Sequence, residues 1–367
     1  MNNELVCAAD IHYSEEKFNQ IEYSFNFFLE YIKKKRPDFV VLAGDYFEKR
    51  LSPDSKVYKH AIGNLIEISK YTNYLIVIKG THSHDANQLE ILRELKKVKN
   101  NIYYYDTFTI DTFKIKDGHG TEKNIKFAFI PEEYPKNHKE YYKRLYEENF
   151  DFIIGHGMLN GAKLHNGVVN KYIKDLRFNY TELDKHCKYN IWGHIHLPQQ
   201  LSEKTFYVGS LGRWQFGEEE PKRFLSINID IHTDNWNIKS IETPTYEYLT
   251  FTYSEYLELR ENIEELLSDE KVYIRIFADK DIEELKKLKE KFKDRIKIEQ
   301  KNKEINIQNE IKYEEVLNKT PEEQYLYVLN EELKTKKFTK KERKLLEKDK
   351  ILPLIKEMIE NTKLCSQ

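Results

Sequence analysis

The sequence predicts a layered α/β fold, and two features carry that prediction. Short apolar runs rich in β-branched and aromatic residues recur through the first half of the chain, and their length fits buried strands. Stretches with the apolar spacing of a helix separate these runs, which is the alternation typical of α/β layers. The runs are ELVCAA (4–9), FVVLA (39–43), YLIVI (74–78), FAFI (127–130), FDFII (150–154) and YNIW (189–192).

The first predicted helix covers residues 15–35 and ends before Pro37, which cannot continue a helix. Residues 55–70 and 86–99 are predicted to be helices as well. In the first helix the apolar side chains recur on one face: Phe18, Ile21, Phe25, Phe28 and Ile32.

Beyond residue 205 the pattern changes. Residues 205–250 carry short runs that predict antiparallel strands, and a small α/β unit is expected after them. That unit is predicted as helix 255–267, strand 271–278, helix 281–292 and strand 296–300.

The last stretch, 311–367, is predicted to be helical. TPEE (320–323) and TKKE (339–342) both match the Thr-x-x-Glu capping box. The basic run 334–344 is more typical of a solvated face or linker than of a binding patch. Three domains are therefore expected, over 1–250, 251–310 and 311–367.

Composition limits the class of protein. The 60 basic and 62 acidic side chains give a net charge of −2, so DNA binding would need a local basic surface. A mean hydropathy of −0.75 indicates a soluble chain. No apolar run approaches the roughly 18 residues of a membrane span, and the N-terminus lacks a signal core.

The chain has only three cysteines and no Cys-x-x-Cys pair, which argues against a disulfide framework. The expected location is the cytoplasm, or the host cytoplasm if a phage encodes the chain. The cysteines are Cys7, Cys187 and Cys365.

Histidine or aspartate, usually beside glycine, follows five of the predicted strands. In layered α/β sheets, sites form at the carboxyl ends of strands, so we expect these segments to converge on one point. The segments are Asp10–His12, Gly44–Asp45, Gly80–Asp85, Gly155–Gly157 and Gly193–His196.

Two aspartates and several histidines without thiolates suit Mn²⁺, Fe²⁺ or Zn²⁺. Asp-x-His and His-x-His place both side chains on one side of an extended segment. A shared carboxylate, most simply Asp45, would bridge two ions about 3.5–4 Å apart. Alone, Asp10–His12 and Gly44–Asp45 are more typical of a loop, turn or cap, and Gly155–Gly157 and Gly193–His196 fit a loop and a metal site equally well. All the segments in order favour a metal site.

These residues resemble the D-x-H, GD, GNH, GH, GHxH pattern of the calcineurin-like metallophosphoesterases over residues 1–230. The segment YVGSLGRWQFGEEEPKRFLSI (207–227) further resembles the SbcD-type DNA repair nucleases. This resemblance implies a four-layer αββα sandwich with a small α/β capping domain and a helical C-terminal extension.

The resemblance also implies an activity and partners. The expected activity is a Mn²⁺-dependent phosphodiesterase acting on DNA ends, exonucleolytic in the 3′→5′ direction with endonucleolytic nicking, as in a phage recombination endonuclease subunit. The implied partner is an SbcC-type coiled-coil ATPase, and a homodimer is left open. Apolar stripes in 321–333 and 345–359 would dock the coiled coil or pack on their own domain.

Carried over position by position, the resemblance implies two ligand sets that share one carboxylate. The first metal would be held by Asp10, His12, Asp45 and His196. The second would be held by Asp45, His156 and His194.

The chain departs from the family's Gly-Asn-His-Asp at Gly80–Asp85. Aligning the His-Asp end assigns His84 as proton donor to the leaving oxygen. The missing Asn ligand is replaced either by His82, the better ligand chemically, or by Ser83, which occupies the aligned position; we take His82. Glu48 stands where some relatives have a histidine near the substrate, and its role is open.

Two other functions remain open from sequence. One is a metallophosphoesterase of small nucleotides or phosphoproteins, against which the segment 207–218 and the helical end argue. The other is a non-catalytic scaffold of the same fold, although such proteins usually lose ligands.

Overall fold

The computed structural model describes residues 3–163, 178–233, 235–278 and 282–300. The chain divides into two units, Met1–Glu299 and Gln300–Gln367. The helical segment predicted at 311–367, with its apolar stripes, lies outside the described residues.

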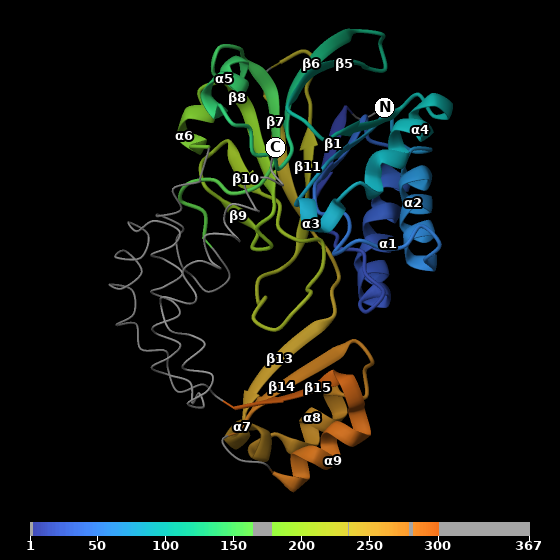
Figure 1. The fold of residues 1–367 in the computed structure, drawn as a ribbon, viewed down its shortest axis with the longest axis vertical. Helices are drawn as coiled ribbons and strands as arrows, with labels where there is room; N and C mark the ends of the chain where they lie inside the picture. Colours follow the sequence, from blue (N-terminus) through green and yellow to red (C-terminus); the bar gives the residue numbers. More distant parts are fainter. Residues whose placement is uncertain (1–2, 164–177, 234, 279–281, 301–367) are drawn as a thin grey trace, which may run out of the picture. The chain divides into compact units, whose positions relative to one another are not determined.

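The first sheet has six strands in the order β12-β11-β1-β2-β3-β4 (Figure 1). Four of them are parallel: β1 (Glu4–Ala8), β2 (Phe39–Ala43), β3 (Tyr74–Ile78) and β4 (Ile102–Tyr105). The crossover helices are α1 (Phe18–Lys35), α2 (Lys56–Ile68) and α4 (Ile91–Val98).

Two late strands complete this sheet. β11 (Arg223–Asn228) pairs antiparallel with β1, and β12 (Asn237–Glu242) pairs antiparallel with β11. The antiparallel pairing expected in 205–250 is therefore present at β11 and β12, which extend the first sheet, whereas β10 (Thr205–Tyr207) pairs parallel with β8 (Cys187–Gly193) in the second sheet.

The second sheet has the order β5-β6-β7-β8-β10-β9. Its strands are β5 (Thr109–Lys116), β6 (Glu122–Ile130), β7 (Phe150–His156), β8 (Cys187–Gly193), β9 (Gln199–Gln200) and β10 (Thr205–Tyr207). The pairs β6–β7, β7–β8 and β8–β10 are parallel.

The central strands β2 and β3 are apolar throughout because both faces of the sheet are covered there. In β2, Val40 and Leu42 pack in the core beneath α1 and α2, whereas Phe39 and Val41 face the second sheet. The outer face of the second sheet is covered in turn by short helices such as α6 (Tyr180–Leu183). The predicted four-layer αββα arrangement is confirmed.

A third, three-stranded sheet follows, and all its strands are parallel: β13 (Glu247–Thr252), β14 (Val272–Phe277) and β15 (Ile296–Glu299). Its helices are α7 (Tyr253–Glu258), α8 (Arg260–Leu266) and α9 (Glu283–Phe292). These elements enclose a separate apolar core. The small sheet begins at Glu247, a few residues before the domain boundary expected from sequence.

No helix among the described residues is long and apolar enough to cross a membrane.

We expect Phe127→Ala to destabilise the protein by about 3–5 kcal/mol, because it empties part of the core between the two large sheets. Phe127 is fully buried and its ring contacts Phe39, Phe113 and Phe152. Urea denaturation measures the loss. The matched control is Phe27→Ala, since Phe27 is 41% exposed; equal losses for both variants would contradict this account of the core.

Candidate active site

The loops after β1, β2, β3, β7 and β8 converge, as the sequence predicts for strands that end at the same edge. Seven side chains meet there in three overlapping groups, with ligand atoms in each group within 4.8 Å of one another. The groups are Asp10, His12 and His196; His12, Asp45 and His84; and Asp45, His156 and His194.

Asp45 belongs to two of these groups and lies between the imidazoles. Its Oδ2 is 2.9 Å from His84 Nδ1 and 3.2 Å from His156 Nε2. His156 Nδ1 donates to the Ala43 carbonyl over 2.8 Å, which turns Nε2 toward Asp45. This shared position is the one expected of a bridging carboxylate.

On the other side of Asp45, two imidazoles point at each other. His12 Nε2 and His196 Nε2 are 2.9 Å apart. Their remote nitrogens face carboxylates: His12 Nδ1 lies 2.9 Å from Glu48 Oε2, and His196 Nδ1 lies 3.1 Å from Glu218 Oε1. Asp10 accepts the backbone N–H of His194 on both oxygens, at 2.9 and 3.0 Å.

Burial and the close approach of charged groups shift the pKa values of the cluster's side chains. Burial raises the pKa of Asp10 to about 6, against the lowering effect of His156. Burial alone would raise the pKa of Asp45, but His156 and His84 outweigh it and hold that pKa below its usual range. Burial would lower the pKa of His156, yet Asp45 and Asp10 raise it to about 10.

The donor set fits divalent cations. It consists of imidazole nitrogens and carboxylate oxygens, the mixed set that Mn²⁺, Fe²⁺ and Zn²⁺ accept. Among the described residues, His12 Nδ1 is buried without a hydrogen-bond partner, because its contact with Glu48 lacks hydrogen-bond geometry. The residues present could therefore hold two ions, with Asp45 between them.

Thr81 is a site residue that the sequence reasoning missed. Its hydroxyl is 3.2 Å from Asp45 Oδ2 and 3.4 Å from both His156 Nε2 and His194 Nδ1. Its backbone N–H also donates to Asp45 Oδ1 over 2.6 Å. A signal was present, since Thr81 directly follows Gly80 as Asn follows Gly in the family pattern.

The structure does not bring His82 to the cluster. Residues His82–Asp85 form the short helix α3, for which Thr81 is the N-cap residue. The helix turns His82 and Ser83 toward solvent and His84 back to Asp45. His82 Nδ1 instead lies 3.3 Å from Lys79 Nζ. The structure therefore places Thr81 beside the cluster, whereas the predicted ligand His82 lies away from it.

Asp85 supports the loop through hydrogen bonds to backbone groups. Its buried carboxylate accepts the backbone N–H groups of Gly80 at 2.7 Å and of Asp45 and Phe47 at 3.1 Å. Burial raises the pKa of Asp85 to about 6. It thus joins the loops after β2 and β3.

The site also concentrates unusual backbone geometry. Four of its residues have positive φ, a conformation uncommon outside glycine, and such strain gathers at functional sites. They are Asp10 (φ 52°), His12 (φ 58°), Asp45 (φ 51°) and His194 (φ 95°).

The segment 207–218, singled out by sequence, wraps the first group of ligands. Trp214 Nε1 donates to the Asp10 carbonyl over 3.1 Å, and Glu218 contacts His196. Tyr207 is buried, and its hydroxyl donates to the Gly157 carbonyl over 2.9 Å.

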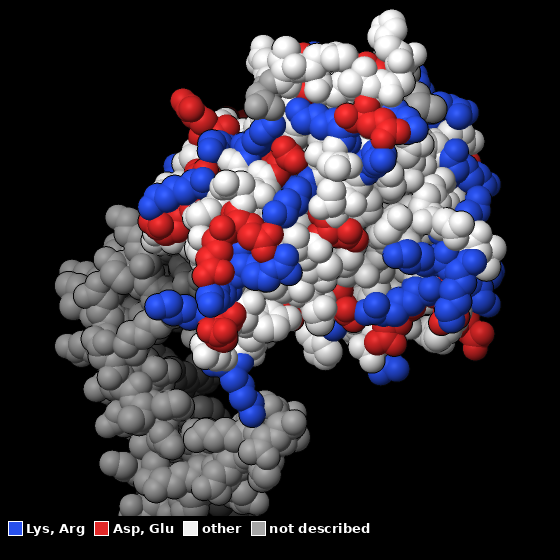
Figure 2. All heavy atoms as spheres, turned by 90° about the horizontal axis from the view of Figure 1, so that it is seen from above, with Lys and Arg blue, Asp and Glu red and all other residues white. Residues whose placement is uncertain are grey.

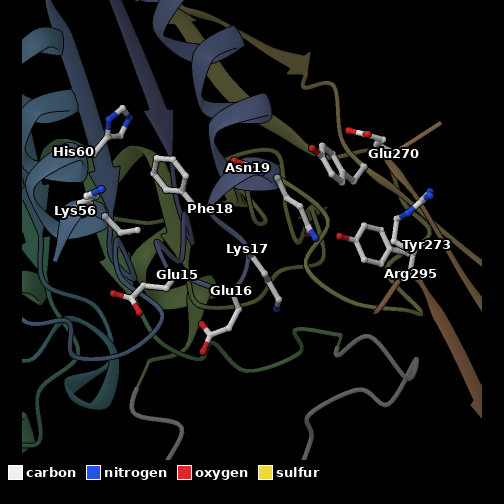
Figure 3. Close-up of a pocket in the computed structure, with 13 residues that line it drawn as sticks. Glu15, Glu16, Lys17, Phe18, Asn19, Lys56, His60, Glu270, Tyr273 and Arg295 are labelled. Carbon is white, nitrogen blue, oxygen red and sulfur yellow. The ribbon is translucent and has the colours of Figure 1, made fainter. Parts of the chain in front are cut away.

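A separate hollow of about 710 Å³ is lined by the starts of α1 and α2 and, from the region of the three-stranded sheet, by Tyr246, Tyr273 and Arg295 (Figure 3). Glu15, Glu16 and Glu270 alternate there with Lys17 and Lys56, so the hollow selects no sign of charge. Its described lining includes none of the seven convergent residues. The chemistry therefore belongs to the loop cluster.

Comparison with known proteins agrees with this geometry. The family model described as calcineurin-like phosphoesterase matches residues 4–198, more than half of the chain. No curated protein sequence matches the chain.

Two solved structures resemble it weakly. The calcineurin-like phosphoesterase YfkN from Bacillus subtilis is 13% identical, with a TM-score of 0.38, covering 71% of this chain and 96% of that one. A novel archaeal phosphodiesterase is 9% identical, with a TM-score of 0.31, covering 65% of this chain and 99% of that one. Because both TM-scores lie below 0.5, we infer nothing about this chain from them.

We expect Gly80→Ala to destabilise the protein by about 1–3 kcal/mol, because a Cβ there would lie 2.1 Å from the Asp45 nitrogen and 2.3 Å from its Oδ1. Thermal unfolding measures the loss. In the control, Gly63→Ala, the Cβ meets nothing within 4 Å on α2, and stability should rise by about 0.5–1 kcal/mol. A Gly80→Ala protein as stable as the wild type would contradict this packing.

We expect Thr81→Val to weaken divalent-ion binding at the Asp45, His156 and His194 group by about tenfold, since it removes the hydroxyl at nearly constant volume. Calorimetric titration with Mn²⁺ measures the effect. Thr81→Ser keeps the hydroxyl and should bind as the wild type does. Loss of binding in His82→Ala, with none in Thr81→Val, would restore His82 as the ligand.

Proposed function

The chain belongs to the calcineurin-like phosphoesterase family, and on that premise we propose that it is a Mn²⁺-dependent phosphodiesterase that cuts DNA ends. The observation that carries the proposal is the convergence of seven ligand-type side chains around the shared carboxylate of Asp45. We further propose 3′→5′ exonuclease action with endonucleolytic nicking.

Two divalent cations, when bound, would supply the Lewis-acid chemistry that activates water and offsets charge growing at phosphorus. The residues that would hold them are Asp10, His12 and His196 for one ion, His156, His194 and Thr81 for the other, and Asp45 for both. Because these groups sit on strand ends of two packed sheets, they need little rearrangement during reaction.

His84 is the proposed proton donor to the leaving oxygen. Its side chain is 31% exposed, so a substrate can reach it from solvent, whereas Asp45 is 2% exposed. The hydrogen bond to Asp45 raises the pKa of His84, which favours the protonated form that a general acid needs. The same bond fixes the ring by its Nδ1.

The choice of DNA as substrate is supported by the segment 207–227, which resembles that of SbcD-type nucleases. In this chain the segment contributes Trp214 and Glu218 to the shell around Asp10 and His196. The surface charge of the face seen from above adds no support, because Figure 2 shows Lys and Arg interspersed with Asp and Glu there.

We also propose an SbcC-type coiled-coil ATPase as partner, with docking through the apolar stripes of 321–333 and 345–359. These stripes lie outside the described residues, so the proposal is supported by the sequence resemblance alone.

The test is degradation of a labelled double-stranded DNA end with Mn²⁺, with Mg²⁺ and with a chelator. We expect Mn²⁺-dependent cutting by the wild type that falls at least about a hundredfold in Asp45→Asn and in His84→Ala. His84→Ala should still bind Mn²⁺, which separates a proton donor from an essential ligand.

Bis(p-nitrophenyl) phosphate serves as a parallel substrate that reports phosphodiester hydrolysis without DNA recognition. Hydrolysis of this compound with no cutting of DNA, even after an SbcC-type ATPase is added, would favour a small-substrate phosphodiesterase. Equal DNA cutting by wild type and both variants would identify a contaminating nuclease. Inactivity on both substrates would favour a non-catalytic scaffold.

A further inference from the structure

We propose that Glu48 and Glu218 are positioning residues that hold His12 and His196 with Nε2 turned to the metal site, making the ion site of Asp10, His12 and His196 the tighter of the two. The inference rests on the proposed metal-dependent function. It assigns roles to two carboxylates that neither the ligand pattern nor the chemistry above requires.

The Glu218 contact is built deep in the protein. Glu218 has a fully buried side chain, and its Oε1 lies 3.1 Å from His196 Nδ1. Its Oε2 accepts the Trp214 backbone N–H over 3.0 Å and lies 3.1 Å from Lys222 Nζ, which is itself fully buried. Lys222 Nζ also donates to the His196 carbonyl over 2.9 Å. Both ends of His196 are therefore fixed by one buried ion pair.

Glu48 stands in the corresponding place for His12. Its Oε2 lies 2.9 Å from His12 Nδ1, and its side chain is 39% exposed. The backbone N–H of Glu48 donates to the Tyr13 carbonyl over 3.1 Å, which keeps this loop beside the Asp10–His12 loop. A small rotation of the carboxylate would give His12 Nδ1 the hydrogen-bond acceptor it lacks among the described residues.

A carboxylate on the remote nitrogen does two things for a metal-binding imidazole. It fixes the tautomer and ring orientation, and it makes the facing nitrogen a stronger donor. The 2.9 Å approach of His12 Nε2 to His196 Nε2 shows that both facing nitrogens are aimed at one point.

The other ion site has weaker support of this kind. His156 Nδ1 donates to the neutral carbonyl of Ala43, and the hydroxyl of Thr81 stands where relatives have an amide. The site of Asp10, His12 and His196 has three carboxylates besides the shared Asp45. They are Asp10 itself and, behind the two imidazoles, Glu48 and Glu218. At the second site, Glu132 Oε2 lies 3.9 Å from His194 Nδ1. The first ion should therefore bind before the second.

A purely structural role for the Glu218–Lys222 pair makes a different prediction. Loss of that pair would then lower stability without changing one ion site selectively. Because removing Glu218 alone leaves a buried lysine unpaired, the charge-balanced variant Glu218→Gln with Lys222→Met is needed beside the single variants.

The experiment is titration of the full chain with Mn²⁺, followed by the loss of the free-ion EPR signal and by calorimetry. The variants are Glu48→Gln, Glu218→Gln and Glu218→Gln with Lys222→Met, each checked by thermal unfolding. Glu219→Gln is the matched control, since Glu219 is the exposed neighbour of Glu218.

We expect two binding steps in the wild type, and a tighter step weakened about 10- to 100-fold in each Glu48 or Glu218 variant, with the weaker step unchanged. Glu219→Gln should match the wild type. Folded variants with an unaltered tighter step, or with both steps weakened equally, would overturn the inference. A wild type that binds no Mn²⁺ would overturn the proposed function itself.

Discussion

The buried carboxylate of Asp45 is the interaction on which the site depends. It accepts a hydrogen bond from the Thr81 N–H and contacts His84 and His156. The chain segments at the ends of β2, β3 and β7 therefore meet on this one side chain. A buried carboxylate without partners would destabilise the fold. Here the N–H and hydroxyl of Thr81 and the imidazoles of His84 and His156 offset that penalty. Burial would lower the pKa of His156, but Asp45 and Asp10 outweigh it and raise that pKa.

The two packed sheets hold the loops of this cluster rigidly enough to tolerate a strained backbone. Positive φ at Asp10 and Asp45 stores strain that only a rigid surround can hold. The loops of the cluster are packed closely against one another. A Cβ on Gly44 would lie 2.2 Å from His156 Nδ1, and one on Gly193 would lie 2.2 Å from the Ala43 carbonyl oxygen. The glycines at the strand ends are thus required by approach of one loop to another, and substitutions there disturb ligands directly.

The groups that contact the remote nitrogens of the imidazoles differ between the two sides of the cluster. On the His12 and His196 side, carboxylates stand behind the imidazoles, one of them in a fully buried ion pair. On the His156 side the support is a backbone carbonyl and a threonine hydroxyl. His84 stands at the more exposed margin between them, where a substrate can arrive.

The sequence by itself determined the layered fold and the convergence of Asp10, Asp45 and the histidines, because strand periodicity is local and parallel strands end at one edge. It also located the segment 207–227. It could not show that His82 lies away from the cluster and Thr81 beside it, because the direction of a side chain depends on where helix α3 begins. Only the tertiary structure decided which carboxylates stand behind His12 and His196, since those contacts join loops that no local pattern relates.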